Sequence, residues 1–115
     1  APEFAGDAKV CYDPKEAFEG ADFIYAKNWS SYQDYGKILS SDPAWMVTMD
    51  KMHLTNHAKF MHCLPVRRNV VVEDAVLDSE HSIVVQQAGN RVWAAQVVLK
   101  QMILTLMKQE SPYLF

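Results

Sequence analysis

The stretch FMHCLPVRRN, residues 60–69, carries the densest set of chemically active groups in this 115-residue chain. Its apolar start, Phe60 and Met61, is typical of the end of a buried strand. Ligands of parallel α/β sheets bind at the carboxyl ends of strands, so a site is expected here. A proline cannot donate to a strand ladder, so Pro65 should end the strand and leave the carbonyls of Cys63 and Leu64 to a ligand.

Each polar side chain in this stretch also has an ordinary structural explanation. A single cysteine or histidine after a strand, such as Cys63 or His62, often only fills or braces the core. The adjacent Arg67 and Arg68 are different, because neighbours on an extended segment point to opposite sides and one should face a cleft. A guanidinium group suits carboxylate or phosphate, so the combination favours an anion site.

The composition describes one ordinary globular domain, with 50% hydrophobic and 22% charged residues. A net charge of -3 argues against nucleic acid as a partner, because phosphate binding needs a basic face. No stretch approaches the roughly 20 apolar residues of a membrane span, and the start has no signal-peptide layout. Only two cysteines are present, Cys11 and Cys63, and a reducing compartment would keep both as thiols. A cytoplasmic protein without nucleic-acid or membrane partners is expected.

The first half of the chain predicts short elements around a long loop. Residues 9–12 suit a short strand, and a helix through residue 21 should follow, with Asp13 as its N-cap and Pro14 at its first position. Residues 22–26, DFIYA, are typical of a buried strand. The polar segment 28–45 has no clear period and is interpreted as a functional loop.

The second half predicts a regular alternation of helices and strands. A helix over 48–56 capped by Thr48, a strand over 59–64 and a helical turn over 73–78 are expected. A buried strand over 82–85, SIVV, should follow. A helix of about 18 residues over 90–107 should end the domain. This order predicts an α/β, Rossmann-like, three-layer domain with a mainly parallel sheet.

Other arrangements of reactive residues are weaker. His53 and His57 lie four positions apart, but no HExxH glutamate and no second cysteine pair accompany them, so no metal is expected. Neighbours on a strand project to opposite faces, which disfavours His62 and Cys63 as a base and nucleophile. No glycine-rich nucleotide motif is present, so no cofactor is expected. Lys27, at the end of the strand 22–26, is either an edge residue or a second cation for a carboxylate.

HCLP, followed 28 positions after Cys63 by Arg91 in AGNR, resembles the aspartate and ornithine carbamoyltransferase family. The resemblance runs over nearly the whole chain. It implies that residues 1–115 are most of a C-terminal amino-acid-binding domain, a fragment of a two-domain enzyme whose N-terminal carbamoyl-phosphate domain is absent. It also implies a homotrimeric parent enzyme without metal or organic cofactor. The STRTR-type phosphate loop of the family does not occur here.

The resemblance also bears on the amino-acid substrate. Ornithine enzymes carry D-x-W-x-S-M-G where this chain has KNWSSYQ, residues 27–33. Lys27 would repel the free α-ammonium of ornithine, whereas an N-acylated ornithine has lost that charge. N-succinyl- or N-acetylornithine is therefore implied. Acetylornithine enzymes carry a lysine two positions after the Asn of RRN, where this chain has Val71, and this departure favours the succinyl branch.

The resemblance assigns roles to six residues. Lys27 and Arg67 would hold the carboxylates of the acylornithine, together with Leu64. Cys63, Leu64 and Arg91 would hold the carbamoyl group, with Cys63 and Arg91 as the catalytic pair. His62 belongs to the same carbamoyl-phosphate set and either polarises the carbonyl or holds the turn.

Four hypotheses about function are therefore carried forward. The first is transfer of the carbamoyl group of carbamoyl phosphate to the δ-amine of an N-acylornithine, in arginine biosynthesis, with the isolated chain inactive. The second is ornithine carbamoyltransferase. The third is a non-catalytic anion- or amino-acid-binding module, and a generic dinucleotide-binding module is a further reading.

Overall fold

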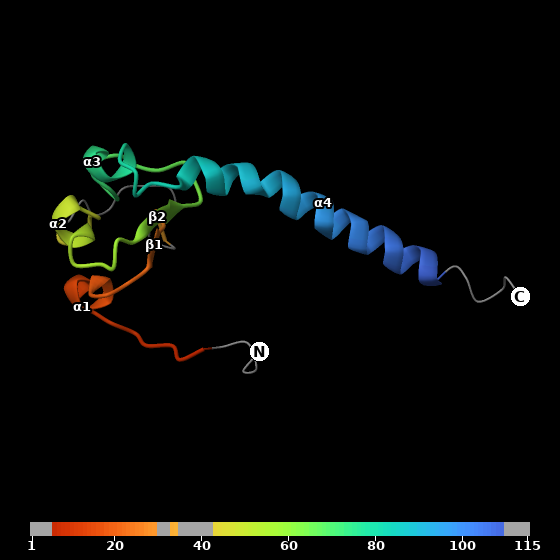
Figure 1. Ribbon diagram of the computed structural model, residues 1–115, viewed down its shortest axis with the longest axis horizontal. Helices are drawn as coiled ribbons and strands as arrows, with labels where there is room; N and C mark the ends of the chain where they lie inside the picture. The colour runs from red at the N-terminus through yellow and green to blue at the C-terminus, as the bar shows by residue number, and fades with distance from the viewer. Residues whose placement is uncertain (1–5, 30–32, 35–42, 110–115) are drawn as a thin grey trace, which may run out of the picture.

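The computed structural model describes residues 6–29, 33–34 and 43–109. The described chain forms three short helices and two short strands of an α/β body, followed by one long helix (Figure 1). In chain order the elements are α1 (Pro14–Phe18), β1 (Phe23–Ala26), α2 (Met49–Met52), β2 (Lys59–His62), α3 (Asp74–Leu77) and α4 (Val84–Gln109). Most of the predicted loop 28–45 lies outside the described residues.

The two strands pair in parallel, which confirms the α/β class with a parallel sheet. Phe23 pairs with Lys59 and Ala26 pairs with His62, so both strands end at the same edge of the sheet. On the other side of β2, Phe60 forms a single parallel bridge with Ser82. In the described part of the chain the sheet thus has two strands and one bridging residue.

The core lies around β2. Phe60 is fully buried at the centre, and Met52 of α2 and Val76 of α3 pack in the same cluster. The remaining buried members are Val47, Ala58, Val72, Leu77 and Val84. Burial of such side chains contributes about 1.5–3 kcal/mol each, so β2 is held firmly and its carboxyl end is a fixed platform.

Two predicted helix starts are confirmed, whereas the last helix begins at Val84 and not at the predicted residue 90. The Asp13 side chain accepts a hydrogen bond from the Lys15 amide at 2.9 Å, and Pro14 occupies the first helical position. The Thr48 hydroxyl accepts from the Lys51 amide at 3.3 Å in the same way. Both helices are shorter than predicted, and α2 ends at Met52.

Three predictions about strands are wrong. Residues 9–12 form no strand, since no neighbouring strand pairs with them, and Val10 and Tyr12 are exposed. The predicted strand 82–85 is one bridging residue, after which α4 begins at Val84. β1 is present but is not buried, because its outer face, with Phe23 and Tyr25, is uncovered in the described residues.

Helix α4 is longer than predicted and projects away from the body (Figure 1). Its 26 residues span about 39 Å at helical rise. Many of its large apolar side chains are exposed: Val92, Trp93, Val97, Val98, Leu99, Met102, Ile103, Leu104, Leu106 and Met107. None of the helices in the described residues is long and apolar enough to cross a membrane.

Candidate functional site

The carboxyl end of β2 turns sharply at residues 63–65. Leu64 has a φ of +53°, which is unfavourable for a side chain of its size, and the Leu64–Pro65 peptide bond is cis. Two side chains hold this turn. The Leu64 amide donates to His62 Nδ1 at 2.9 Å, and Asn28 Nδ2 donates to the Pro65 carbonyl at 2.8 Å. A fixed turn of this kind presents its backbone groups in one orientation.

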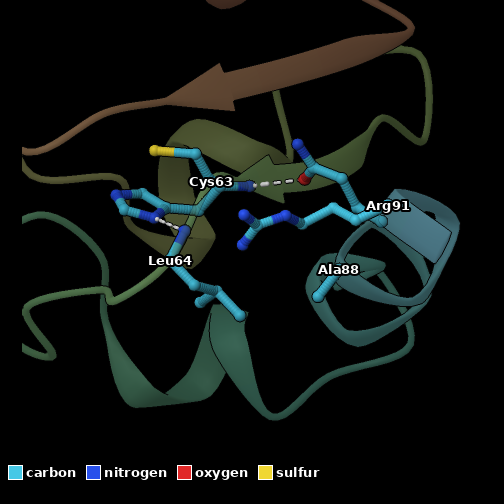
Figure 2. A pocket seen from close by; sticks show the side chains of 6 residues that line it. Cys63, Leu64, Ala88 and Arg91 are labelled. Atoms are coloured by element: carbon cyan, nitrogen blue, oxygen red, sulfur yellow. Dashed lines mark hydrogen bonds between the residues drawn. The ribbon is translucent and has the colours of Figure 1, made fainter. Parts of the chain in front are cut away.

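The first turns of α4 face this turn. Gln87 Oε1 accepts a hydrogen bond from the His62 amide at 3.0 Å and so ties the helix to the end of β2. Arg91 follows four residues later on the same side of the helix. Figure 2 shows the Arg91 guanidinium reaching from α4 toward the backbone around Cys63.

A pocket of about 410 Å³ opens between the turn and the helix. Its lining residues are His62, Cys63, Leu64, Gln87, Ala88 and Arg91. Arg91 has no carboxylate partner among the described residues and is the charged group of this lining. A guanidinium fork opposite the backbone of a tight turn can bind a small group that has both a negative oxygen and an N–H.

His62 is the buried polar side chain of the site. It is 1% exposed, and burial lowers the pKa of its imidazole below the ordinary value of 6.5. The ring is therefore neutral at pH 7. Its Nδ1 accepts from Leu64, and its Nε2 is buried without a hydrogen-bond partner in the described structure.

The thiol of Cys63 lies apart from the buried imidazole. Cys63 is exposed whereas His62 is buried, as expected for neighbours at a strand end. Figure 2 shows the sulfur turned away from the Arg91 guanidinium. The backbone of Cys63, rather than its thiol, therefore faces the guanidinium.

Four of the six predicted site residues line the pocket, and two do not. Lys27 follows Ala26, the partner of His62 in the sheet, so it lies at the same edge but outside the pocket lining. Arg67 also lies outside that lining and makes a long contact of 3.5 Å from Nη1 to the Trp29 carbonyl. The segments after β1 and β2 are thus joined near the pocket.

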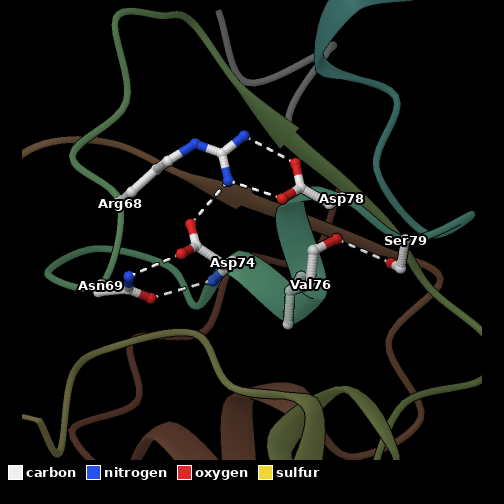
Figure 3. Close-up of polar contacts among 6 residues, drawn as sticks. All are labelled: Arg68, Asn69, Asp74, Val76, Asp78 and Ser79. Carbon is white, nitrogen blue, oxygen red and sulfur yellow. Dashed lines mark hydrogen bonds and ion pairs between the residues drawn. The ribbon is translucent and has the colours of Figure 1, made fainter.

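The neighbouring Arg68 is committed to an ion-pair network (Figure 3). Its guanidinium bonds Asp78 through two nitrogens at 2.8 and 2.7 Å, and Asp74 at 2.6 Å. These contacts lower the pKa of both carboxyl groups. Asn69 adds a hydrogen bond to Asp74 at 2.8 Å. Arg68 therefore fastens the segment after the turn to α3.

Two residues of the site were not singled out from the sequence. Gln87 and Asn28 each bond a backbone group more than 20 residues away, and such a partner leaves no local pattern. The spacing of Gln87 and Arg91 on one helix face was a usable signal. The predicted helix begins only at residue 90, so Gln87 lies before it, whereas α4 begins at Val84.

Comparison with known proteins now decides the family. The profile of "Aspartate/ornithine carbamoyltransferase, Asp/Orn binding domain" matches residues 2–102. The chain belongs to this family. The resemblance noted from HCLP and Arg91 is thereby confirmed.

Individual members of the carbamoyltransferase family resemble the chain over most of its length. It is 58% identical over 105 residues to the N-succinylornithine carbamoyltransferase of Bacteroides thetaiotaomicron, covering 90% of this chain and 33% of that protein. It is 39% identical over 97 residues to an N-acetylornithine carbamoyltransferase of Xylella fastidiosa, covering 79% and 29% respectively. The chain thus spans about a third of the length of these curated relatives.

A solved structure agrees in fold. A crystal structure of an N-acetyl-L-ornithine transcarbamylase variant, complexed with carbamyl phosphate and N-succinyl-L-norvaline, superimposes with a TM-score of 0.58 at 41% identity. The match covers 70% of this chain and 26% of that one. The α/β arrangement described above is therefore that of a carbamoyltransferase domain.

Proposed function

We propose that the protein containing this chain transfers the carbamoyl group of carbamoyl phosphate to the δ-amine of N-succinyl-L-ornithine. The observation that carries the proposal is the pocket in which Arg91 faces the tight turn of Cys63 and Leu64. The greater similarity to N-succinylornithine enzymes, 58% against 39%, supports the succinyl group. The products are N-succinylcitrulline and phosphate.

In this mechanism the neutral δ-amine attacks the carbamoyl carbon. A C–N bond forms, and the bond from carbon to the phosphate oxygen breaks with its electrons going to phosphate. The proton that the amine loses passes to the departing phosphate. Arg91 stabilises the negative charge that develops on the carbamoyl oxygen. The carbonyls of Cys63 and Leu64 accept from the carbamoyl NH2 and fix its orientation. The reaction needs no metal or organic cofactor.

Lys27 and Arg67 are assigned to the carboxylates of the acylornithine. Both follow strand ends at the same edge of the sheet, and their cationic groups suit a dicarboxylate. Val71 supports the succinyl reading, because it is 1% exposed and its site is filled by an apolar side chain. A lysine there, as in acetylornithine enzymes, would have to bury its stem or charge.

The rest of the protein completes the proposal. The chain is most of the C-terminal amino-acid-binding domain, and an N-terminal domain supplies the carbamoyl-phosphate ligands that are missing here. The parent enzyme is a homotrimer in the cytoplasm, acting in arginine biosynthesis. The 115-residue chain by itself is inactive, since half of the groups that bind the two substrates are absent from it.

The deciding experiment assays the complete protein with N-succinyl-, N-acetyl- and free ornithine side by side. The highest kcat/KM is expected with N-succinylornithine. A preference for N-acetylornithine would move the assignment to the acetyl branch, and faster turnover of free ornithine would overturn the argument from Lys27. No carbamoyl transfer with any of the three would leave only a binding module. The isolated chain is assayed in parallel, and turnover at a comparable rate would refute its inactivity.

A further inference from the structure

The turn at residues 63–65 is braced from two directions, by the side chains of His62 and Asn28. His62 Nδ1 accepts from the Leu64 amide at 2.9 Å, and Asn28 Nδ2 donates to the Pro65 carbonyl at 2.8 Å. One brace comes from the end of β2 and the other from the residues after β1. Between them they fix the residues on both sides of the Leu64 carbonyl.

The brace from His62 determines which ring nitrogen carries the proton. A backbone N–H is always a donor, so Nδ1 must accept and cannot be protonated. A neutral imidazole then carries its proton on Nε2. Because Nε2 is buried and no described residue accepts from it, a second proton on the ring would add a buried charge and also break the bond to Leu64.

The strained position of Leu64 explains why such braces are needed. Its φ of +53° is unfavourable for a residue with a large side chain and costs free energy. One hydrogen bond at its amide and one at the next carbonyl hold that conformation. Without them the backbone of Cys63 and Leu64 would relax, and its carbonyls would no longer be held in one orientation.

We propose that His62 and Asn28 are positioning residues that hold the backbone carbonyls of the 63–65 turn in place, with His62 acting through Nδ1 as a fixed acceptor. Since Nδ1 is occupied by the Leu64 amide and Nε2 is buried, neither ring nitrogen is available to polarise the carbonyl of the substrate. This role rests on the proposed carbamoyl transfer, in which those carbonyls orient the carbamoyl NH2.

The tautomer is tested without any assay of activity. Nitrogen NMR of the histidine-labelled 115-residue chain should show a His62 ring with bare Nδ1 and protonated Nε2 at pH 7. A ring protonated on Nδ1, or on both nitrogens, would overturn the proposal. This result does not depend on carbamoyl transfer, so it separates the present inference from the proposed function.

The role is tested by a matched pair of variants in the complete enzyme. In His62→Asn the short amide places its oxygen near the position of Nδ1, whereas in His62→Gln the longer amide lies near Nε2. We expect kcat to fall on the order of 10²-fold in His62→Gln, with little change in KM, and considerably less in His62→Asn. The pH profile should keep its shape in both. Wild-type kcat in His62→Gln, or equal losses in the two variants, would refute an Nδ1 role.

The second brace provides an independent measurement if His62→Gln fails to fold. Asn28→Asp keeps the shape of the side chain but removes the Nδ2 donor to Pro65. A loss of kcat like that of His62→Gln is expected, and wild-type kcat would contradict the proposal. His53→Gln, at an exposed position after α2, is the matched control and should leave kcat unchanged. If the wild-type enzyme shows no carbamoyl transfer, the proposed function is wrong. The tautomer of His62 measured by NMR does not depend on that result.

Discussion

Arg91 illustrates how a single residue acquires its role from position and from the lack of a partner. The Arg68 guanidinium lies within 2.8 Å of the carboxylates of Asp74 and Asp78, and these ion pairs hold α3. Arg91, on the first turns of α4, has no such partner in the described residues and lines the pocket. Two residues of one type thus differ: Arg68 holds the structure together, whereas Arg91 is proposed to act in carbamoyl transfer.

The first prediction concerns this guanidinium. In the complete enzyme Arg91→Met should lower kcat by roughly 10²- to 10³-fold, the usual effect of removing one donor to a developing oxyanion. Arg91→Lys keeps the charge but loses the planar fork, so its kcat should lie between those of Arg91→Met and wild type. Steady-state kinetics measure both, with Lys15→Met on α1 as the control. Unchanged kcat in Arg91→Met would exclude its role.

The second prediction concerns the pH dependence of stability. Burial lowers the pKa of His62 in the folded state, so below about pH 6.5 the unfolded chain binds a proton that the folded chain does not. The free energy of unfolding should therefore decrease as the pH falls from 6.5 toward the folded pKa. The carboxyl groups of Asp74 and Asp78, whose pKa values are lowered, act only below about pH 4.

Urea unfolding between pH 5 and 7.5 measures the His62 effect. His62→Asn cannot bind the extra proton, and its stability should vary less with pH over this interval than that of the wild type. Parallel curves for the two proteins would show that His62 has the same pKa in the folded and unfolded states.

At the scale of elements, β2 organises both the core and the site. Its residue Phe60 is fully buried and lies opposite Ile24 of β1. The Phe60 amide donates to the His81 carbonyl, and the Phe60 carbonyl accepts from the Ile83 amide. Its last residue, His62, begins the pocket. Packing at one position of the strand therefore positions the candidate site two residues further along.

The third prediction follows from that burial. Phe60→Ala should cost roughly 3–5 kcal/mol of unfolding free energy, since it removes a fully buried ring and leaves a cavity. Phe23→Ala, on the neighbouring strand, should cost far less in the isolated chain because Phe23 is 64% exposed. Chemical denaturation of the three proteins gives the comparison. Equal losses would show that β2 is not the centre of the core.

The elements also show which features of the fold were readable from the sequence. Asp13 and Thr48 cap helices through bonds to amides two or three residues away, so local patterns predicted both starts. The run SIVV led to the wrong prediction of a strand over residues 82–85, because its isoleucine and valines are β-branched and favour strands. The ladder there ends after Ser82, and the Gln87 amide already bonds the Ile83 carbonyl in a helical turn.

The residues of the candidate site likewise divide into those that the sequence predicted and those that it did not. His62, Cys63 and Leu64 are contiguous, and their place after a strand was enough to predict a ligand site at its carboxyl end. Arg91 was assigned to the site only because HCLP and AGNR resemble motifs of the carbamoyltransferase family. Gln87 and Asn28 depend on contacts across 25 and 37 residues, which no local pattern encodes.

At the scale of the whole molecule, the projecting helix α4 is the element whose apolar side chains are least covered by the rest of the described chain. Its apolar side chains occupy two sides, with Val92, Leu99 and Ile103 on one and Trp93 and Leu104 on another. An exposed apolar surface of this extent marks a region that another surface normally covers. In the proposed complete enzyme, the surface that covers α4 comes from the part of the protein outside this chain.

The fourth prediction is that the isolated chain associates through α4. Burying a leucine or isoleucine side chain contributes about 1.5–3 kcal/mol, so several such contacts are enough for measurable association. Light scattering after size exclusion should give a mass that rises with concentration, and Leu99→Glu combined with Ile103→Glu should reduce it. Gln101→Glu, which adds charge between the two, is the control and should change it little. A monomeric wild-type chain at high concentration would show instead that α4 stays uncovered in solution, and the apolar stripe would then need a partner from the rest of the protein.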